Sequence, residues 1–179
     1  IANTTEDLPP DTKHKTISRD YEYKRLGTVS LLAGIDLQTG KAFPLVREKH
    51  SSKEYVEFLQ LLNSKYPKKD KIRLVLDNLK VHSSKETRDY LATVPGRFEF
   101  VFTPKHGSWL NLVEGFFSKL TRQSLKGIRV KSVEELTQRI YKYFDEVNAD
   151  PVVYHWKYKL DEIDPKEKVI VDTLPQLQS

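Results

Sequence analysis

The chain of 179 residues contains no cysteine and no methionine. The lack of cysteine excludes a disulfide scaffold and any thiolate metal site, and it leaves the cellular compartment open. No apolar run approaches the roughly 18 residues that a membrane-spanning helix needs, and no signal-peptide pattern opens the chain. Because the chain starts at Ile1 and has no methionine, we expect it to be a piece of a longer protein.

The remaining composition fits one polar, globular domain. The length is sufficient to bury a core, and hydrophobic residues make up 38% of the chain against 31% charged residues. The formal net charge of +5 indicates a modest preference for polyanionic partners such as nucleic acid.

The most informative stretch is LVLDN, which spans residues 74–78. Its short apolar run predicts a buried strand, and Asp77 falls at the carboxyl end, where open α/β sheets bind their ligands. A second acid, Glu114, lies in the apolar helix opener SWLNLVEGFF. It sits at the border of the apolar face, one helical turn from Asn111 and Phe117.

Periodicity and capping residues predict the element order ββαβαβαα and therefore a mixed α/β sheet. Strands are expected at residues 28–36, 41–48, 71–77 and 97–103, the first two as an antiparallel hairpin with Pro44 on an edge strand. Helices are expected after capping boxes at Ser51 with Glu54, Ser83 with Glu86 and Ser132 with Glu135, and after Ser108. The helix after Ser51 is expected to bury Val56, Leu59 and Leu62.

We expect residues 1–26 to form an extended arm and residues 27–150 to form the catalytic domain. Residues 151–179 are expected to form a strand-free extension with a tail from about residue 164. The arm interleaves basic residues with Tyr21 and Tyr23.

Two carboxylates on rigid supports suit metal-dependent phosphodiester chemistry. Two divalent ions about 4 Å apart can activate the attacking oxygen and stabilise the leaving oxygen. Hard ions such as Mg²⁺ take carboxylate ligands, so we expect Asp77 and Glu114 to be the catalytic, metal-binding residues. Asn78, His82 and Asn111 supply neutral groups that could orient water or phosphate.

Each of these residues also has a plainer interpretation. Asp77 and Asp36 could be turn or cap residues, and Glu114 could pair with Lys119 or Arg122. His82 and His106 could be structural or exposed. Trp109 could be a core residue or a stacking platform for a base. The basic residues could form a solvated face or contact phosphates; the DNA-binding candidates are Lys105, His106, Trp109, Lys119, Arg122, Lys126 and Arg129.

Three segments together carry a family resemblance: LVLDNLKVH, FEFVFTPKHGSWLNLVEGFFSKLTRQSLKG and YFDEVNADPVVYHWKYKLDEI. With the early GTVSLLAGIDLQTGKAF, they resemble a bacterial insertion-sequence transposase of the mariner-related DDE superfamily from about Arg25 to Ile163. The resemblance implies an RNase H-like core that cleaves transposon ends with Mg²⁺ or Mn²⁺ in a two-metal site. It also implies that Asp77 is the second acid of the triad and Glu114 the third.

The family's first aspartate has no counterpart in this chain, and Asp36 matches a non-catalytic hairpin position. We therefore expect Ile1 to lie just downstream of that acid, the first, central strand to be missing, and the chain alone to be inactive. The vacant position is expected to be filled by residues 1–10 or by a partner chain.

The resemblance further implies a cytoplasmic, nucleoid-associated bacterial protein that acts on transposon ends and target DNA, without a membrane, as a homodimer or higher assembly. Two alternatives remain open: an RNase H- or resolvase-like nuclease without strand transfer, and a non-catalytic, domesticated DNA-binding or assembly module.

Overall fold

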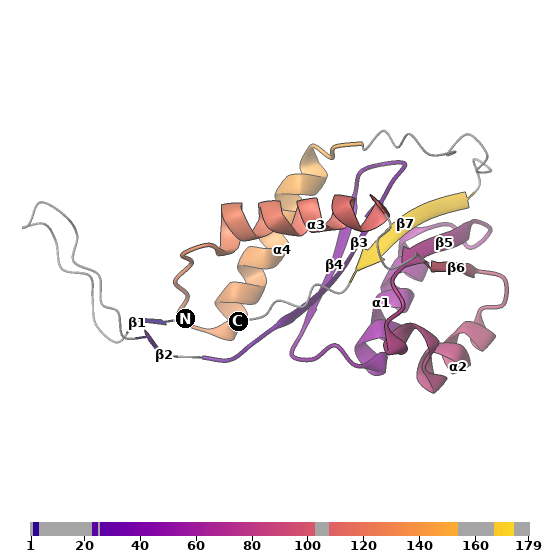
Figure 1. Ribbon diagram of the computed structural model, residues 1–179, viewed down its shortest axis with the longest axis horizontal. Helices are drawn as coiled ribbons and strands as arrows, with labels where there is room; N and C mark the ends of the chain where they lie inside the picture. The colour runs from indigo at the N-terminus through magenta and orange to yellow at the C-terminus, as the bar shows by residue number, and fades with distance from the viewer. Residues whose placement is uncertain (1, 4–22, 25, 103–107, 154–166, 174–179) are drawn as a thin grey trace, which may run out of the picture.

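The computed structural model describes residues 2–3, 23–24, 26–102, 108–153 and 167–173. Within them, a mixed five-stranded sheet in the order β4-β3-β7-β5-β6 carries helices on both faces (Figure 1). The strands are β3 (Ser30–Asp36), β4 (Ala42–Arg47), β5 (Lys71–Leu76), β6 (Phe98–Phe102) and β7 (Glu167–Thr173). The helices are α1 (Ser52–Lys65), α2 (Lys85–Thr93), α3 (Ser108–Leu120) and α4 (Val133–Ala149). The predicted α/β class is confirmed.

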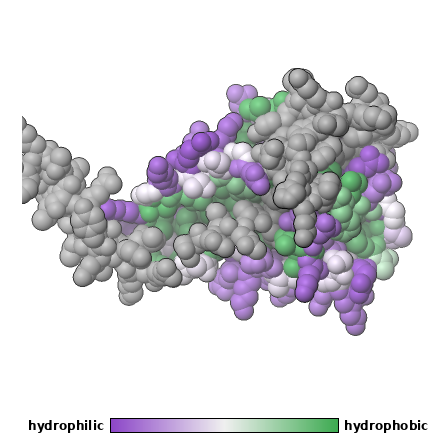
Figure 2. Space-filling model, viewed as in Figure 1, coloured by the Kyte–Doolittle hydropathy of each residue, from purple (hydrophilic) through white to green (hydrophobic). Residues whose placement is uncertain are grey.

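Strand alternation divides the core into two layers, because successive side chains of a strand point to opposite faces. Leu31, Ala33 and Ile35 of β3 join Val75 of β5 in a cluster with α3 and α4. Leu32, Leu74 and Leu76 join a second cluster with α1, and α2 packs against that side. In the space-filling view, hydrophilic residues line the upper and lower margins of the molecule and hydrophobic residues show between them (Figure 2).

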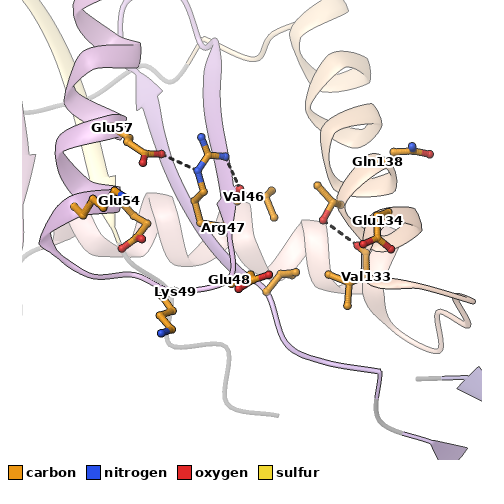
Figure 3. A pocket seen from close by; sticks show the side chains of 12 residues that line it. Val46, Arg47, Glu48, Lys49, Glu54, Glu57, Val133, Glu134 and Gln138 are labelled. Carbon is orange, nitrogen blue, oxygen red and sulfur yellow. Dashed lines mark hydrogen bonds and ion pairs between the residues drawn. The ribbon is translucent and has the colours of Figure 1, made fainter.

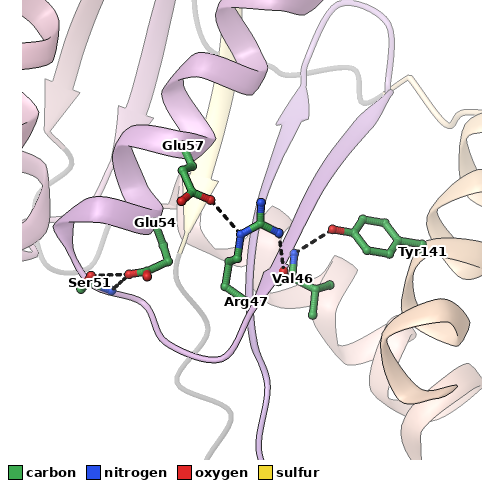
Figure 4. A network of polar contacts seen from close by, with 6 residues as sticks. All are labelled: Val46, Arg47, Ser51, Glu54, Glu57 and Tyr141. Atoms are coloured by element: carbon green, nitrogen blue, oxygen red, sulfur yellow. Dashed lines mark hydrogen bonds and ion pairs between the residues drawn. The ribbon is translucent and has the colours of Figure 1, made fainter. Parts of the chain in front are cut away.

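The predicted hairpin is present, with Leu31 opposite Val46 and Ala33 opposite Pro44. Because β4 is an edge strand, Pro44 is tolerated without a ladder hydrogen bond, as predicted. Helix α4 covers part of this edge: the Val46 amide donates to the Tyr141 hydroxyl at 3.1 Å (Figure 4).

Of the first two predicted capping boxes, one is present as predicted and the other is displaced by one residue. The box of Ser51 and Glu54 is complete, and it begins α1 where the sequence predicted. At α2 the prediction of Ser83 is wrong by one residue, since Ser84 caps the helix and accepts from the Thr87 amide at 3.2 Å. Residues Lys80–Ser83 form a 3₁₀ turn instead.

Helix α1 buries a different set of side chains from the one predicted. Tyr55, Phe58, Leu59 and Leu62 are buried. Val56 is only partly buried, so its expected place in the core is wrong. Spacing of three and four residues fits both sets, and the aromatic residues take the inward stripe because they bury more apolar area.

The central position of the sheet is filled by β7, which lies antiparallel to β3 and parallel to β5. The expectation of a strand-free segment after Asp150 is therefore wrong, because residues 167–173 form this strand. The central strand was expected to be missing and its position to be filled by residues 1–10 or by a partner chain, whereas β7 holds it. Of residues 1–10, Ala2–Asn3 (β1) pair with Tyr23–Lys24 (β2), and the rest lie outside the described residues. The limits proposed above for arm, domain and extension stay predictions.

Candidate active site

Asp77 follows β5 directly, at the sheet edge where the parallel strands β5, β6 and β7 all end. This is the carboxyl-terminal edge at which α/β sheets bind ligands. The Asp77 side chain keeps 32% of its surface exposed. The residue is thus supported by a buried strand and still open to solvent.

The two oxygens of the Asp77 carboxylate have different surroundings. Oδ1 accepts a hydrogen bond from the Leu79 amide at 3.1 Å, and it lies 3.1 Å from Nε2 of His82. Among the residues that the structure describes, no hydrogen bond is made to Oδ2. The bond from Leu79 is the local turn that the plainer interpretation of Asp77 predicts, so that interpretation is correct for one oxygen and leaves the other available.

His82 is buried, with 2% of its surface exposed, as the structural interpretation of this residue predicts. Its ring packs edge-on against Tyr55 of α1, with centroids 4.6 Å apart. Burial lowers the pKa of His82, and the charge and hydrogen bond of Asp77 oppose this shift only in part. The ring is therefore neutral at pH 7, and Nε2 carries the hydrogen because a carboxylate can only accept.

Glu114 lies on α3, and its side chain is exposed. The preceding residue, Val113, is buried in the same cluster as Val75, which precedes Asp77 by two residues. Helix α3 thus packs on the face of the sheet to which Val75 points. Within the described part of the chain, no ion pair joins Glu114 to Lys119 or Arg122.

The other predicted site residues divide into three groups. Asn78 is exposed beside Asp77. Asn111 and Trp109 belong to the first turns of α3, where only the backbone is described, while Lys105 and His106 lie outside the described residues. The remaining basic candidates are all exposed, from the end of α3 through the π-helical segment Thr121–Leu125 into the following loop: Lys119, Arg122, Lys126 and Arg129.

Asp36 is a turn residue, as the sequence predicted. Its Oδ1 accepts from the amides of Gln38 and Thr39, at 2.8 and 3.3 Å. Its Oδ2 accepts from the Tyr66 hydroxyl at 2.8 Å, and burial together with this carboxylate raises the pKa of Tyr66. Both oxygens are occupied and the residue is buried, so Asp36 does not join the site.

Strand β7 carries an acid, Asp172, near its carboxyl end. Asp172 pairs with Gly34 of β3. Two positions earlier, Ile170 is buried in the cluster on the α1 face.

Asp77 and Glu114 are the carboxylates that could hold a divalent metal ion at this site. No group of three or more His, Cys, Asp or Glu residues that could hold a metal is present in the described ranges. Two carboxylates from separate elements nevertheless fit Mg²⁺, which binds through one or two carboxylates and completes its shell with water and phosphate oxygens.

A second candidate, a cavity of about 680 Å³, lies beside the edge strand β4, between its carboxyl end and the first turns of α1 and α4 (Figure 3). Several of its charges already have partners: Arg47 pairs with Glu57 at 2.7 Å, and Glu54 accepts from the Ser51 amide at 2.8 Å (Figure 4). None of the predicted site residues lines it. We interpret it as a junction between elements.

Comparison with known proteins agrees with this geometry. The chain matches the family described as DDE superfamily endonuclease over residues 8–137, well over half of its length, and it belongs to that family. It is also 26% identical over 113 residues to the insertion element IS630 uncharacterized 39 kDa protein of Shigella sonnei. That alignment covers 63% of this chain and 33% of the relative, so the chain spans about a third of the relative's length. The resemblance to insertion-sequence DDE proteins that the motifs predicted is confirmed.

No helix among the described residues combines the length and the apolar character needed to cross a membrane.

Proposed function

We propose that the chain is the catalytic domain of an insertion-sequence transposase and that Asp77 and Glu114 are its metal-binding, catalytic carboxylates. The observation that carries the proposal is Asp77 itself. In a member of the DDE superfamily, it stands at the carboxyl end of a buried parallel strand, its side chain is partly exposed, and Oδ2 accepts no hydrogen bond from the described residues. The hairpin followed by parallel strands supports an RNase H-like arrangement, in which β7 holds the central position.

The reaction would proceed in two steps, hydrolysis at the transposon end followed by strand transfer into the target. Water attacks a phosphorus at a transposon end, the bond to the 3′ oxygen breaks, and a 3′ hydroxyl and a 5′ phosphate result. The freed 3′ hydroxyl then attacks a target phosphodiester and releases a target 3′ hydroxyl. Mg²⁺ or Mn²⁺, when bound, stabilises the charge that develops on the oxygens. Asp77 and Glu114 would hold the ions, and no covalent protein intermediate is needed.

The exposed basic residues after Glu114 support DNA as the substrate. Lys119, Arg122, Lys126 and Arg129 follow the acid along one continuous stretch, and such residues bind the phosphate backbone without reading sequence. Binding should therefore weaken steeply with salt, because each neutralised phosphate releases counterions. We also propose that the protein assembles as a homodimer or a higher oligomer.

The test is cleavage of duplex DNA bearing insertion-sequence ends, with Mg²⁺ or Mn²⁺. Two forms should be assayed: this chain and a form extended upstream of Ile1. We expect the extended form to cleave and to join ends, and this chain alone to cleave poorly. Asp77→Asn and Glu114→Gln should abolish cleavage, while the exposed Glu86→Gln on α2 should not.

Three other results would change the conclusion. Cleavage without joining would favour an RNase H- or resolvase-like nuclease. Salt-sensitive DNA binding with no cleavage by either form would favour a non-catalytic module. Cleavage by the short chain that is lost in Asp36→Asn would mean that the first acid had been misassigned.

A further inference from the structure

The unequal surroundings of the two Asp77 oxygens have a specific source. The Leu79 amide comes from the turn itself and would be present with many side chains at position 82. The contact from His82, at 3.1 Å, is different because it brings a buried ring from the following 3₁₀ turn to the same oxygen, Oδ1. A carboxylate held at one oxygen by two donors has lost most of its freedom to rotate.

His82 is itself held in place from two sides. Tyr55 of α1 packs edge-on against its ring. The turn that carries it is fastened to α2, because the buried Thr87 hydroxyl donates to the Val81 carbonyl at 2.7 Å. The position of Nε2 is thus set by the α1 and α2 layer of the core, and this layer in turn sets the position of Asp77 Oδ1.

The other ring nitrogen, Nδ1, indicates that packing alone does not explain why residue 82 is a histidine. Nδ1 of His82 is buried and has no hydrogen-bond partner among the described residues. A buried polar atom without a partner destabilises the folded state, and an apolar side chain would avoid that penalty. The one polar contact in the described structure that a histidine makes and an aliphatic residue could not make is the bond to Asp77.

We propose that His82 is a positioning residue, which with the Leu79 amide fixes Oδ1 of Asp77 so that Oδ2 is presented to a divalent cation. The inference rests on the proposed function, in which Asp77 binds metal. Residues that orient a metal ligand typically change affinity by about 10- to 100-fold when they are replaced.

The experiment measures Mn²⁺ affinity of this chain from the free-ion signal in electron paramagnetic resonance, together with the urea midpoint of each variant. His82→Leu removes the donor and the unpaired nitrogen. It should weaken Mn²⁺ binding by about 10-fold or more, while the urea midpoint stays equal or rises. His82→Gln, which keeps an N–H near the position of Nε2, should recover most of the affinity. Tyr55→Phe, a change in the same packing layer, should leave the affinity within about twofold of the unchanged chain.

The outcomes separate this inference from the proposed function. If Asp77→Asn leaves Mn²⁺ affinity unchanged, or if the unchanged chain binds no Mn²⁺, the proposed metal site fails and the inference fails with it. If Asp77→Asn abolishes binding and His82→Leu retains it, only the positioning role is overturned. Should His82→Leu not fold, His82→Asn, whose amide is too short to reach Oδ1, takes its place with the same expected loss.

Discussion

Asn148 near the end of α4 hydrogen-bonds both backbone polar groups of Ala42 on the edge strand β4. Its Oδ1 accepts from the Ala42 amide and its Nδ2 donates to the Ala42 carbonyl, each at 2.8 Å. Pro44 has no amide to offer, and the Val46 amide is bonded to Tyr141. The outward amides of this strand are therefore withdrawn from pairing with another chain, as edge strands require.

We expect Asn148→Ala to lower the free energy of unfolding by about 2 kcal/mol, because the Ala42 amide and carbonyl are fully buried and would lose their partners. Urea unfolding measures the change, and the exposed Asp145→Ala on the same helix is the control. Light scattering should also show more self-association in Asn148→Ala. An effect equal to that of the control would mean that solvent replaces both bonds.

Arg97 should be the most sensitive charged residue outside the site. It is buried and has no carboxylate partner in the described structure; its guanidinium donates to the carbonyls of Asn63, Tyr66, Pro67 and Asp70, which end α1 and lead into β5. The ammonium group of a lysine cannot reproduce the several N–H donors that the planar guanidinium holds in fixed directions. Arg97→Lys should therefore cost about 3 kcal/mol in urea unfolding, since several carbonyls lose charged donors and the ammonium group replaces a buried guanidinium. The exposed Arg88→Lys on α2 should be neutral.

His82 should make stability depend on pH. Burial lowers its pKa in the folded state below the ordinary 6.5, so the unfolded chain binds this proton more tightly. The stabilisation is complete above about pH 6.5 and is lost as the pH falls toward the folded-state pKa, by at most about 1.4 kcal/mol per pH unit. Urea midpoints between pH 7.5 and 5 should fall less in His82→Leu than in the unchanged chain. The exposed His50→Gln should fall as the unchanged chain does.

The central position of β7 can be tested through Ile170, which is fully buried against Leu74 and α1. We expect Ile170→Ala to cost about 3 kcal/mol, the usual price of a large core truncation. Val152→Ala, at an exposed position outside the sheet, serves as the matched control. A loss below about 0.5 kcal/mol, typical of surface sites, would show that β7 does not belong to the sheet.

The sequence predicted most of this fold because its signals are local. Alternation and turn residues located the hairpin, and the Ser51 box located the start of α1. The prediction missed β7, although VIVD carries the same short apolar run before an acid as LVLD at residues 74–77. Its central position could not be predicted, because that position depends on pairing with β3 and β5, both distant along the chain.

The candidate site was predicted in part for the same reason. Asp77 and Glu114 could be predicted because each is an acid next to a run of apolar residues. The bond from His82 to Asp77 spans an intervening 3₁₀ turn, and no periodic pattern predicts which way that turn directs the ring. The burial of His82 depends on Tyr55, which comes from a different helix.

The metal site of Asp77 and Glu114 is tested most directly by a Mn²⁺ titration of the isotope-labelled chain, followed by paramagnetic broadening of its backbone amide resonances. If Asp77 and Glu114 bind metal together, the amides around both residues broaden over one concentration range, and Asp77→Asn or Glu114→Gln removes both effects. Broadening confined to one of the two carboxylates, or centred instead on the glutamates beside β4, would contradict this shared metal site.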